Sequence, residues 1–303
     1  MSIIAFPWYG GKARFLLILQ ALIPEHRIWC EPFMGSAVFT LNHIISQREI
    51  INDLDFGLVC FFKTLQDEKA GQELIDRILK MERTKPEFKK ALADRNAWDE
   101  KQKGKEPQYI NVERALNEFT VITQSYNSTR GNYTDKNKKS ETYLIKCFQN
   151  LPEVRRRLKN VEIWNKSALD VIRELKDNKD AFLFLDPPYE HDKRNPGATK
   201  VYKEEMSEND HKELAELIAD AKCKIILCGY RYNDVMNEEP YDEYLLKQGG
   251  RWKCYKLADT KKTAAPSKDG KKPPAKEFIW VNYTLPDYAK YYISMKEYGT
   301  KGD

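Results

Sequence analysis

The stretch "AFLFLDPPY", residues 181–189, constrains the fold of this chain more than any other. Five mostly apolar residues in succession are typical of a buried strand, and the two prolines that follow cannot continue its hydrogen-bond ladder. Pro188 also restricts Pro187 to extended geometry. The strand therefore ends on a rigid corner that carries the Asp186 carboxylate, the Pro187 carbonyl and the Tyr189 ring. Two acceptors beside an aromatic plane suit a planar amino group, such as that of a nucleobase; a plain turn capped by aspartate is the alternative.

Strand-like and helix-like patterns alternate at both ends of the chain. This rhythm is typical of an α/β fold with a parallel sheet. Strands are predicted at 27–33, 48–53, 160–164, 181–185, 224–230, 251–258 and 276–285. Helices are predicted at 12–23, 36–46, 167–175 and 208–221.

The middle of the chain lacks this alternation. From about residue 56 the periodicity becomes helical, as at 71–81, and a long polar stretch follows at 83–109 with no assigned element. The simplest organisation is an α/β domain formed by residues 1–56 and 147–303, split by an inserted module at 57–146.

Composition narrows the classes of function. The net charge of +5, from 51 basic and 46 acidic side chains, permits binding to nucleic acid without requiring it. No apolar run reaches the length of a membrane span and the first residues do not resemble a signal peptide, so we expect a cytoplasmic protein. The six cysteines form no Cys-x-x-Cys pair and the four histidines no His-x-x-x-His array, which argues against structural zinc and a disulfide framework.

Three further strand-like units end on residues suited to a ligand site, because parallel sheets bind ligands beyond the carboxyl ends of their strands. Gly35 in "EPFMGS" lets the backbone approach a ligand closely. Asp53 in "NDLD" is placed where an acid accepts hydrogen bonds from ribose hydroxyls, and Asp170 in "SALD" ends a third unit. Taken singly, helix capping explains both aspartates equally well or better.

Taken together, these motifs resemble the Dam-like family of DNA adenine-N6 methyltransferases (D12 class, α group). The pieces "PWYGGK", "EPFMGS", "NDLD", "SALD", "LDPPY", "DHKELAELI", "ILCGY" and "KEFIWVNY" follow the family's order from residue 7 to residue 283. The resemblance implies a Rossmann-like methyltransferase sheet with an inserted, mainly helical target-recognition domain at 57–146. It also implies S-adenosylmethionine as methyl donor, no metal, and double-stranded DNA as the substrate.

The resemblance assigns roles to individual residues. Asp186, Pro187 and Tyr189 would hold an adenine flipped out of the duplex, and Tyr126, Asn127 and Arg130 in "SYNSTRGNY" would contact DNA. The methyl donor would meet six residues: Trp8 as an apolar wall, Lys12 near its carboxylate, Phe33 and Gly35 around the methionine part, Asp53 at the ribose and Asp170 at its adenine.

One departure from the family and several alternatives bear on this interpretation. The family usually has a second glycine shortly after Gly35, which this chain has lost or replaced by Ala37. No cysteine follows a proline, which argues against a cytosine-C5 methyltransferase. An N4-cytosine methyltransferase and a non-catalytic DNA-binding protein on a methyltransferase scaffold stay open, as does a cognate restriction endonuclease as partner.

Overall fold

Eight strands within the described residues form one mixed sheet with the order β3-β2-β1-β4-β5-β7-β6-β8. The computed structural model describes residues 2–135, 138–188, 206–231, 241–246, 250–261, 274–289 and 297–298. Strands β1 to β5 run parallel, and β7, β6 and β8 add antiparallel pairs. The strands are β1 Ile28–Glu31, β2 Arg48–Asn52, β3 Glu162–Trp164, β4 Ala181–Leu185, β5 Lys224–Arg231, β6 Lys253–Lys261, β7 Pro274–Val281 and β8 Glu297–Tyr298.

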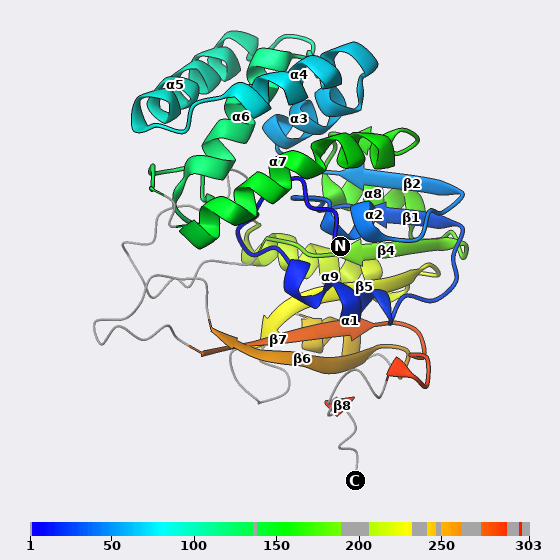
Figure 1. Cartoon of the computed structure of the whole chain (residues 1–303). Coiled ribbons are helices and arrows are strands. Elements are labelled where there is room, and N and C mark those ends of the chain that lie inside the picture. Colours follow the sequence, from blue (N-terminus) through cyan, green and yellow to red (C-terminus); the bar gives the residue numbers. More distant parts are fainter. Residues whose placement is uncertain are drawn as a thin grey trace.

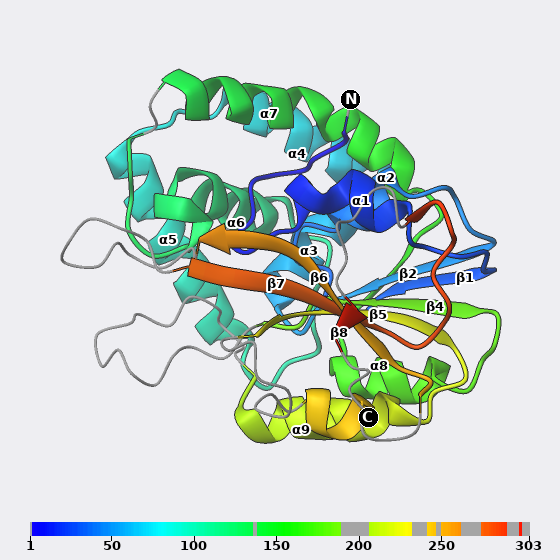
Figure 2. The same ribbon diagram turned by 90° about the horizontal axis from the view of Figure 1, so that it is seen from below.

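Helices cover both faces of this sheet. Figure 2 shows α1, α2 and α7 on one side of the strands and α8 and α9 on the other. The helical segments are η1 Ala13–Phe15, α1 Leu16–Gln20, α2 Val38–Asn42, α3 Phe56–Gln66, α4 Glu68–Lys80, α5 Lys85–Gln102, α6 Val112–Gln124, η2 Tyr126–Ser128, α7 Lys138–Leu158, α8 Ala168–Leu175, α9 Glu208–Ala219 and η3 Asp242–Leu246.

Strand β4 explains why the apolar run of the sequence does not alternate with polar residues. All five of its residues are buried. Phe182 and Phe184 pack into the core beneath α1 and α2, while Leu183 and Leu185 pack into the core beneath α8 and α9. A central parallel strand with helices on both faces has no solvent side, so an apolar residue is favoured at every position.

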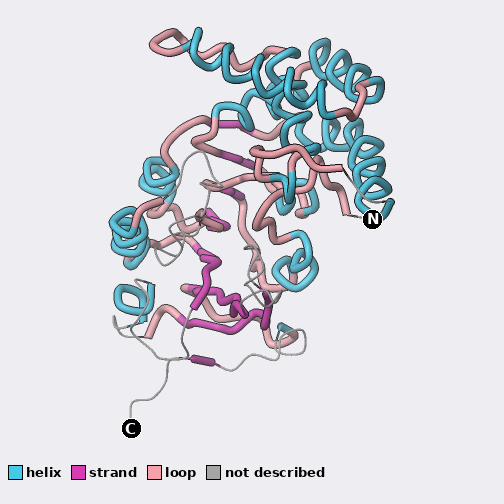
Figure 3. Tube along the Cα trace, turned by 90° about the vertical axis from the view of Figure 1, so that its left-hand side faces the viewer, coloured by secondary structure: helices cyan, strands magenta, loops and turns pink. Residues whose placement is uncertain are grey.

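Helices α3 to α6 gather at the β2 end of the sheet, opposite β6 and β7 (Figure 1), and Figure 3 shows the same concentration of helices at one end of the stacked strands. Helices α3, α4 and α6 share one hydrophobic core with the N-terminal segment and with the sheet, including Phe6, Ile51, Phe61, Phe119 and Ile163. The buried residues of α5 pack against α6 in a separate small cluster. Helix α7 belongs to the core shared with the sheet and runs across the predicted boundary at 146/147. The helical region is therefore packed onto the sheet rather than tethered to it.

The predicted strands are confirmed, with shifted limits. Strands β1, β2 and β3 are shorter than their patterns suggested, β4 has the predicted limits, β5 and β6 extend further along the chain, and β7 begins and ends earlier. The helix predicted at 36–46 is wrong in length, because α2 ends at Asn42 and His43 adopts an extended backbone. Helix α5 occupies the polar stretch to which no element was assigned. Only Phe88 and Ala91 of α5 are buried, so it lacks the apolar stripe that reveals a helix in a sequence.

The described residues bear on two expectations from the sequence, one about membrane spans and one about disulfides. Among the described residues, no helix combines the length and the apolar character needed to cross a bilayer. All six cysteines are described, and each is a buried thiol rather than half of a disulfide.

Two ion pairs on β2 provide a direct test of how burial governs their contribution to stability. Glu49 accepts hydrogen bonds of 2.6 and 2.7 Å from Arg157 of α7, and both side chains are almost completely buried. We predict that Glu49→Ala lowers the free energy of unfolding by about 3 kcal/mol, because it leaves a buried guanidinium without its carboxylate. Urea denaturation measures the loss.

The neighbouring pair on the same strand is the matched control. Arg48 and Glu162 make an equally bidentate contact, but their side chains are 43% and 40% exposed. Glu162→Ala should cost less than about 1 kcal/mol, since water screens an exposed pair. Similar losses for the two variants would contradict the importance of the α7 contact.

Candidate active site

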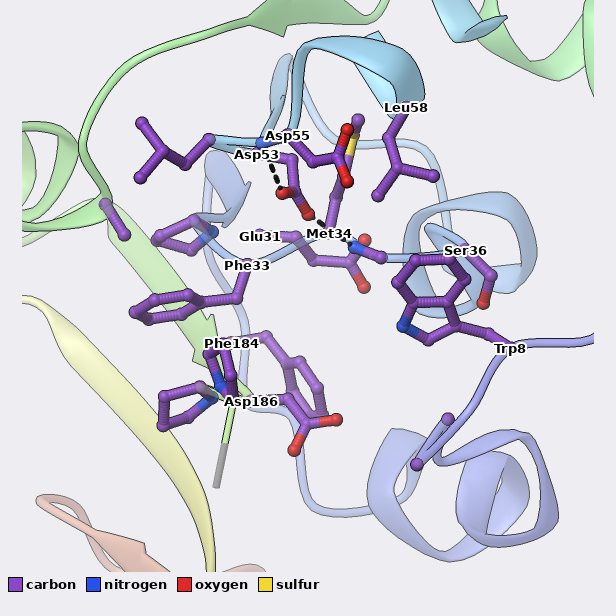
Figure 4. Close-up of a pocket in the computed structure, with 18 of the residues that line it drawn as sticks. Trp8, Glu31, Phe33, Met34, Ser36, Asp53, Asp55, Leu58, Phe184 and Asp186 are labelled. Carbon is purple, nitrogen blue, oxygen red and sulfur yellow. Dashed lines mark hydrogen bonds between the residues drawn. The ribbon is translucent and has the colours of Figure 1, made fainter. Parts of the chain in front are cut away.

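A pocket opens at the carboxyl ends of the parallel strands β1 to β4. Its walls come from the loops that follow these strands, from the N-terminal segment and from the helical region. Figure 4 shows Asp53 and Asp55 together on one side, Asp186 on the opposite side and Glu31 between them. This is the edge at which open parallel sheets bind their ligands.

The β1–α2 loop forms the floor of the pocket with an unusual backbone. Gly35 has a φ of 47°, and a methyl group placed on it would lie 2.6 Å from Trp8 Nε1. Its N–H donates to Asp53 Oδ2 at 3.0 Å. Two features therefore require glycine at position 35: the left-handed backbone and the close approach of the Trp8 indole.

Two aspartates after β2 have separate tasks. Asp55 caps α3, its Oδ1 accepting from Gly57 N at 2.8 Å. Asp53 instead accepts from Gly35 N and from the backbone N–H of Asp55, which leaves it facing the pocket. Burial, and next the charge of Asp55, raise the pKa of Asp53 to about 6 against the two backbone hydrogen bonds and Arg130.

Glu31, at the end of β1, is a third acid in this pocket and is almost fully buried. Its Oε2 accepts from Thr40 Oγ1 at 2.8 Å, and that hydroxyl accepts from Trp29 Nε1 at 2.6 Å. Burial raises the pKa of Glu31 to about 8, the Thr40 hydrogen bonds oppose the rise, and the nearby Asp186 adds to it. Glu31 is therefore expected to be neutral at neutral pH, and a cationic ligand would favour its ionised form.

The corner after β4 is held by a buried lysine. Lys12 Nζ lies 3.0 Å from Asp186 Oδ1 and 3.4 Å from Glu277 Oε2. Glu277, on β7, also accepts from Arg14 at 2.7 Å. The Asp186 side chain keeps 19% of its surface exposed, whereas those of Lys12 and Glu277 are buried, so this carboxylate is the part of the network that a substrate can reach.

Comparison with known proteins gives a matching family and a relative. The model of the family "D12 class N6 adenine-specific DNA methyltransferase" matches residues 8–248 of the 303. The chain belongs to this family. It is also similar to the DNA N-6-adenine-methyltransferase of Escherichia phage P1, with 41% identity over 64 residues. That match covers 21% of this chain and spans only 8% of the phage protein's length.

Seven of the nine residues expected at the methyl donor or at the target base line this one pocket. They are Trp8, Lys12, Phe33, Gly35, Asp53, Asp186 and Pro187. Lys12 differs from its expected role in one respect, because the structure places its ammonium between two carboxylates of the protein. Tyr189 lies outside the described residues, and its role stays a prediction.

Asp170 does not line the pocket. Its side chain is 59% exposed in the first turn of α8 and pairs with Arg173, one turn further along the helix, at 2.7 Å. Ser167, Ala168 and Leu169 line the pocket at this point instead. The helix dipole explains an acid in a first helical turn, and the expected contact of Asp170 with the donor stays a prediction that its position outside the pocket lining does not support.

The three residues expected to contact DNA also differ in where they lie. Tyr126 and Asn127 are exposed on the loop after α6, as a DNA contact requires. Arg130 lines the pocket instead, and its side chain is only 8% exposed because it pairs with Asp55 and Glu118. The guanidinium thus faces the pocket in this conformation, and the expected DNA contact of Arg130 stays a prediction.

Glu31, Asp55 and Glu277 are acidic residues of the site to which the sequence assigned no role. Glu31 and Asp55 stood inside the motifs "EPFMGS" and "NDLD", so an acid directly after a buried strand was the available signal. Glu277 interrupts the apolar strand β7, and such an inward-facing charge indicates a buried partner. Within the described part of the chain, no group of three or more His, Cys, Asp or Glu side chains is arranged to hold a metal ion.

The raised pKa of Glu31 predicts a pH-dependent gain of stability when its charge is removed. Between about pH 4.5 and pH 8 the unfolded chain releases this proton before the folded protein does, so stability falls as pH rises. Glu31→Gln keeps the acceptor for Thr40 but cannot ionise. Thermal unfolding should show the variant more stable than the parent by over about 1 kcal/mol near pH 8.5, with little difference near pH 4.

The exposed Glu106→Gln is the control, and it should shift neither curve. A Glu31→Gln variant that is less stable than the parent near pH 8.5 would contradict the assignment of an uncompensated buried acid.

Proposed function

We propose that this protein transfers a methyl group from S-adenosylmethionine to N6 of adenine in double-stranded DNA, at a specific site. Membership of the adenine-specific family supports the reaction. The observation that carries the proposal is the arrangement of the pocket, where Asp186 faces Asp53 across one cavity (Figure 4) that Pro187 and Gly35 also line. Methyl transfer requires an amine-binding corner and a donor-binding wall at this close range.

The wall on the Asp53 side suits the donor. Asp53 has both carboxylate oxygens fixed by backbone N–H groups, which aims its remaining acceptor positions into the pocket, where ribose hydroxyls would donate. Trp8, Phe33 and Met34 supply apolar surface, and Glu31 offers a buried carboxylate to a cation. When bound, S-adenosylmethionine supplies a methyl group activated by a sulfonium.

The opposite side suits the adenine amino group. Asp186 and the Pro187 carbonyl would each accept one N6 hydrogen, which favours a more tetrahedral nitrogen and aims its lone pair across the pocket. Lys12 fixes the orientation of Asp186 and places a positive charge behind it. Orientation and preorganised charge of this kind supply several kcal/mol to a transfer reaction.

Access to this corner requires the adenine to leave the duplex, because a stacked base cannot enter a protein pocket. Tyr189, next in sequence to the corner, is proposed to replace part of the lost stacking. Residues 57–146 are proposed as the target-recognition domain, with Tyr126 and Asn127 on its exposed loop as DNA contacts. A cognate restriction endonuclease stays a prediction from the family resemblance.

Removing the corner carboxylate tests the reaction. Asp186→Ala should reduce transfer of labelled methyl groups from S-adenosylmethionine to mixed-sequence DNA by at least about a hundredfold, since the amine loses an oriented acceptor. Donor affinity, measured by calorimetry, should change little. The labelled base should be N6-methyladenine; labelled N4-methylcytosine would favour the alternative substrate.

Asp180→Ala, at the exposed amino end of the same strand, is the matched control and should retain the parental rate. Donor binding without any transfer by the parent protein would instead support a non-catalytic DNA-binding protein on a methyltransferase scaffold.

Two glycine substitutions test the donor wall. Gly35→Ala should weaken donor binding by tenfold or more, on the order of 1.4 kcal/mol, because the new methyl group must displace the Trp8 indole. Gly104 has a φ of 73° with nothing within 4 Å of the added methyl group, so Gly104→Ala carries the backbone strain without the collision. Calorimetric titration should show parental affinity for the Gly104 variant, and equal losses for both would contradict the proposed wall.

A further inference from the structure

Arg130 connects the exposed recognition loop, residues 125–133, to the interior of the pocket. It follows η2 with a left-handed φ of 62°, and its N–H donates to Ser125 Oγ at 2.9 Å. The turn directs its side chain inward, where Nη1 hydrogen-bonds to Asp55 and, at 3.2 Å, to Glu118. Its neighbours Tyr126 and Asn127 are exposed, so the loop has a solvent side and a pocket side.

Two routes lead from Arg130 to the donor wall. The first runs through Asp55, whose backbone N–H donates to Asp53 at 2.9 Å, and Asp53 in turn accepts from Gly35 N. The second runs through Trp8, since the guanidinium lies 5.2 Å from the centre of the indole ring that packs against Gly35. Both the carboxylate and the aromatic wall of the donor site are thus held by one side chain of the loop.

The same side chain is anchored to the helical region by a buried charge cluster. Glu118 of α6 also pairs with Arg114 at 2.8 Å, and Arg114 pairs with Asp99 of α5 at 2.8 Å. Arg95 lies 3.7 Å from Glu118. Breaking one member of such a buried network leaves its partner uncompensated, so the members are expected to move as a unit.

We propose that Arg130 is a positioning residue that couples DNA contact at the 125–133 loop to donor affinity in the pocket. This inference rests on the proposed function. A duplex that holds the loop in the conformation described here keeps Arg130 on Asp55 and Trp8, and therefore favours donor binding. By thermodynamic reciprocity, the donor then favours DNA binding by the same factor.

Charge gives the coupling a distinctive pH signature. Asp53 faces the negative Asp55, the positive Arg130 and two backbone N–H groups. Arg130 in turn pairs with Glu118, which belongs to the cluster with Arg114 and Asp99. Arg130 lowers the pKa of Asp53 against burial and against Asp55. Without the guanidinium, Asp53 takes up its proton at a higher pH, so the pH at which donor affinity is half lost moves upward.

The test measures the Kd of S-adenosylhomocysteine by calorimetry, with and without a mixed-sequence DNA duplex at low salt. In the parent protein DNA should tighten binding by about fivefold or more. Arg130→Gln should weaken binding in the absence of DNA, abolish the tightening by DNA and raise the pH midpoint. Arg130→Lys, which keeps the charge, should restore the pH midpoint.

Two further variants separate coupling from folding. Asp55→Asn keeps a side-chain acceptor to cap α3 but loses the charge that holds Arg130, so it should reproduce the loss of tightening. Arg77→Gln removes an exposed, ion-paired arginine of α4 and should leave every donor measurement at the parental value. The coupling would be overturned if the Arg130→Gln and Asp55→Asn proteins both kept the parental donor affinity, the parental response to DNA and the parental pH midpoint. Failure of the parent protein to bind S-adenosylhomocysteine would contradict the proposed function itself.

Discussion

The concentration of carboxylates at one edge of a buried sheet governs the rest of this structure. Parallel pairing places the ends of β1, β2 and β4 side by side, which brings Glu31, Asp53 and Asp186 around one pocket. Carboxylates removed from water and placed close together oppose each other's ionisation. The parallel strands supply no basic side chain to this pocket among the described residues, and both counter-charges come from elsewhere: Lys12 from the N-terminal segment and Arg130 from the helical region. The helical region is thus an electrostatic part of the site.

The sequence revealed whatever depends on local pattern. An apolar run such as 181–185 predicts a buried strand, and an acid directly after it predicts a polar group at the edge of the sheet, which Asp186 and Asp53 confirm. Contacts between segments far apart in the sequence produce no such local pattern. Nothing near Arg130 indicates that it pairs with Asp55, 75 positions earlier, and basic residues in an amide-rich loop are as common in DNA contacts as in buried ion pairs.

Asp170 and helix α5 show two opposite ways in which sequence patterns fall short. The motif at Asp170 suggested a ligand contact, whereas no apolar pattern indicated α5. Asp170 matched the position of a ligand contact, yet the rotation of α8 turns its side chain to solvent, and a helix's rotation is set by packing that the motif does not encode. Helix α5 has no clear apolar stripe, because it rests on α6 through few residues and is otherwise exposed. Its start is nevertheless marked by Thr84, which caps the helix, and by Pro86 in the first turn.

Ala37 bears on the loop in which the family usually has a second glycine. It adopts a φ of 52°, the left-handed region that favours glycine, and is fully buried among the core residues around Met34 and Ile51. This backbone costs roughly 1 kcal/mol for alanine, while the buried methyl group returns a similar amount through packing. Alanine therefore holds the left-handed backbone at this position, with the loop fixed by hydrogen bonds from Met34 N to Asn52 O and from Ala37 N to Met34 O.

Charge also gives the pocket a means of distinguishing the two forms of the proposed donor. Among its described lining residues, five acids, Glu31, Asp53, Asp55, Asp186 and Asp210, stand against two bases, Lys12 and Arg130. A ligand that carries a sulfonium reduces this imbalance and favours the ionised form of Glu31. The demethylated product has lost that charge, so Glu31 is expected to take up its proton again and the product to be held less tightly. An excess of buried acid, which lowers the stability of the fold at pH values where Glu31 is ionised, thereby favours entry of a cationic donor and release of a neutral product.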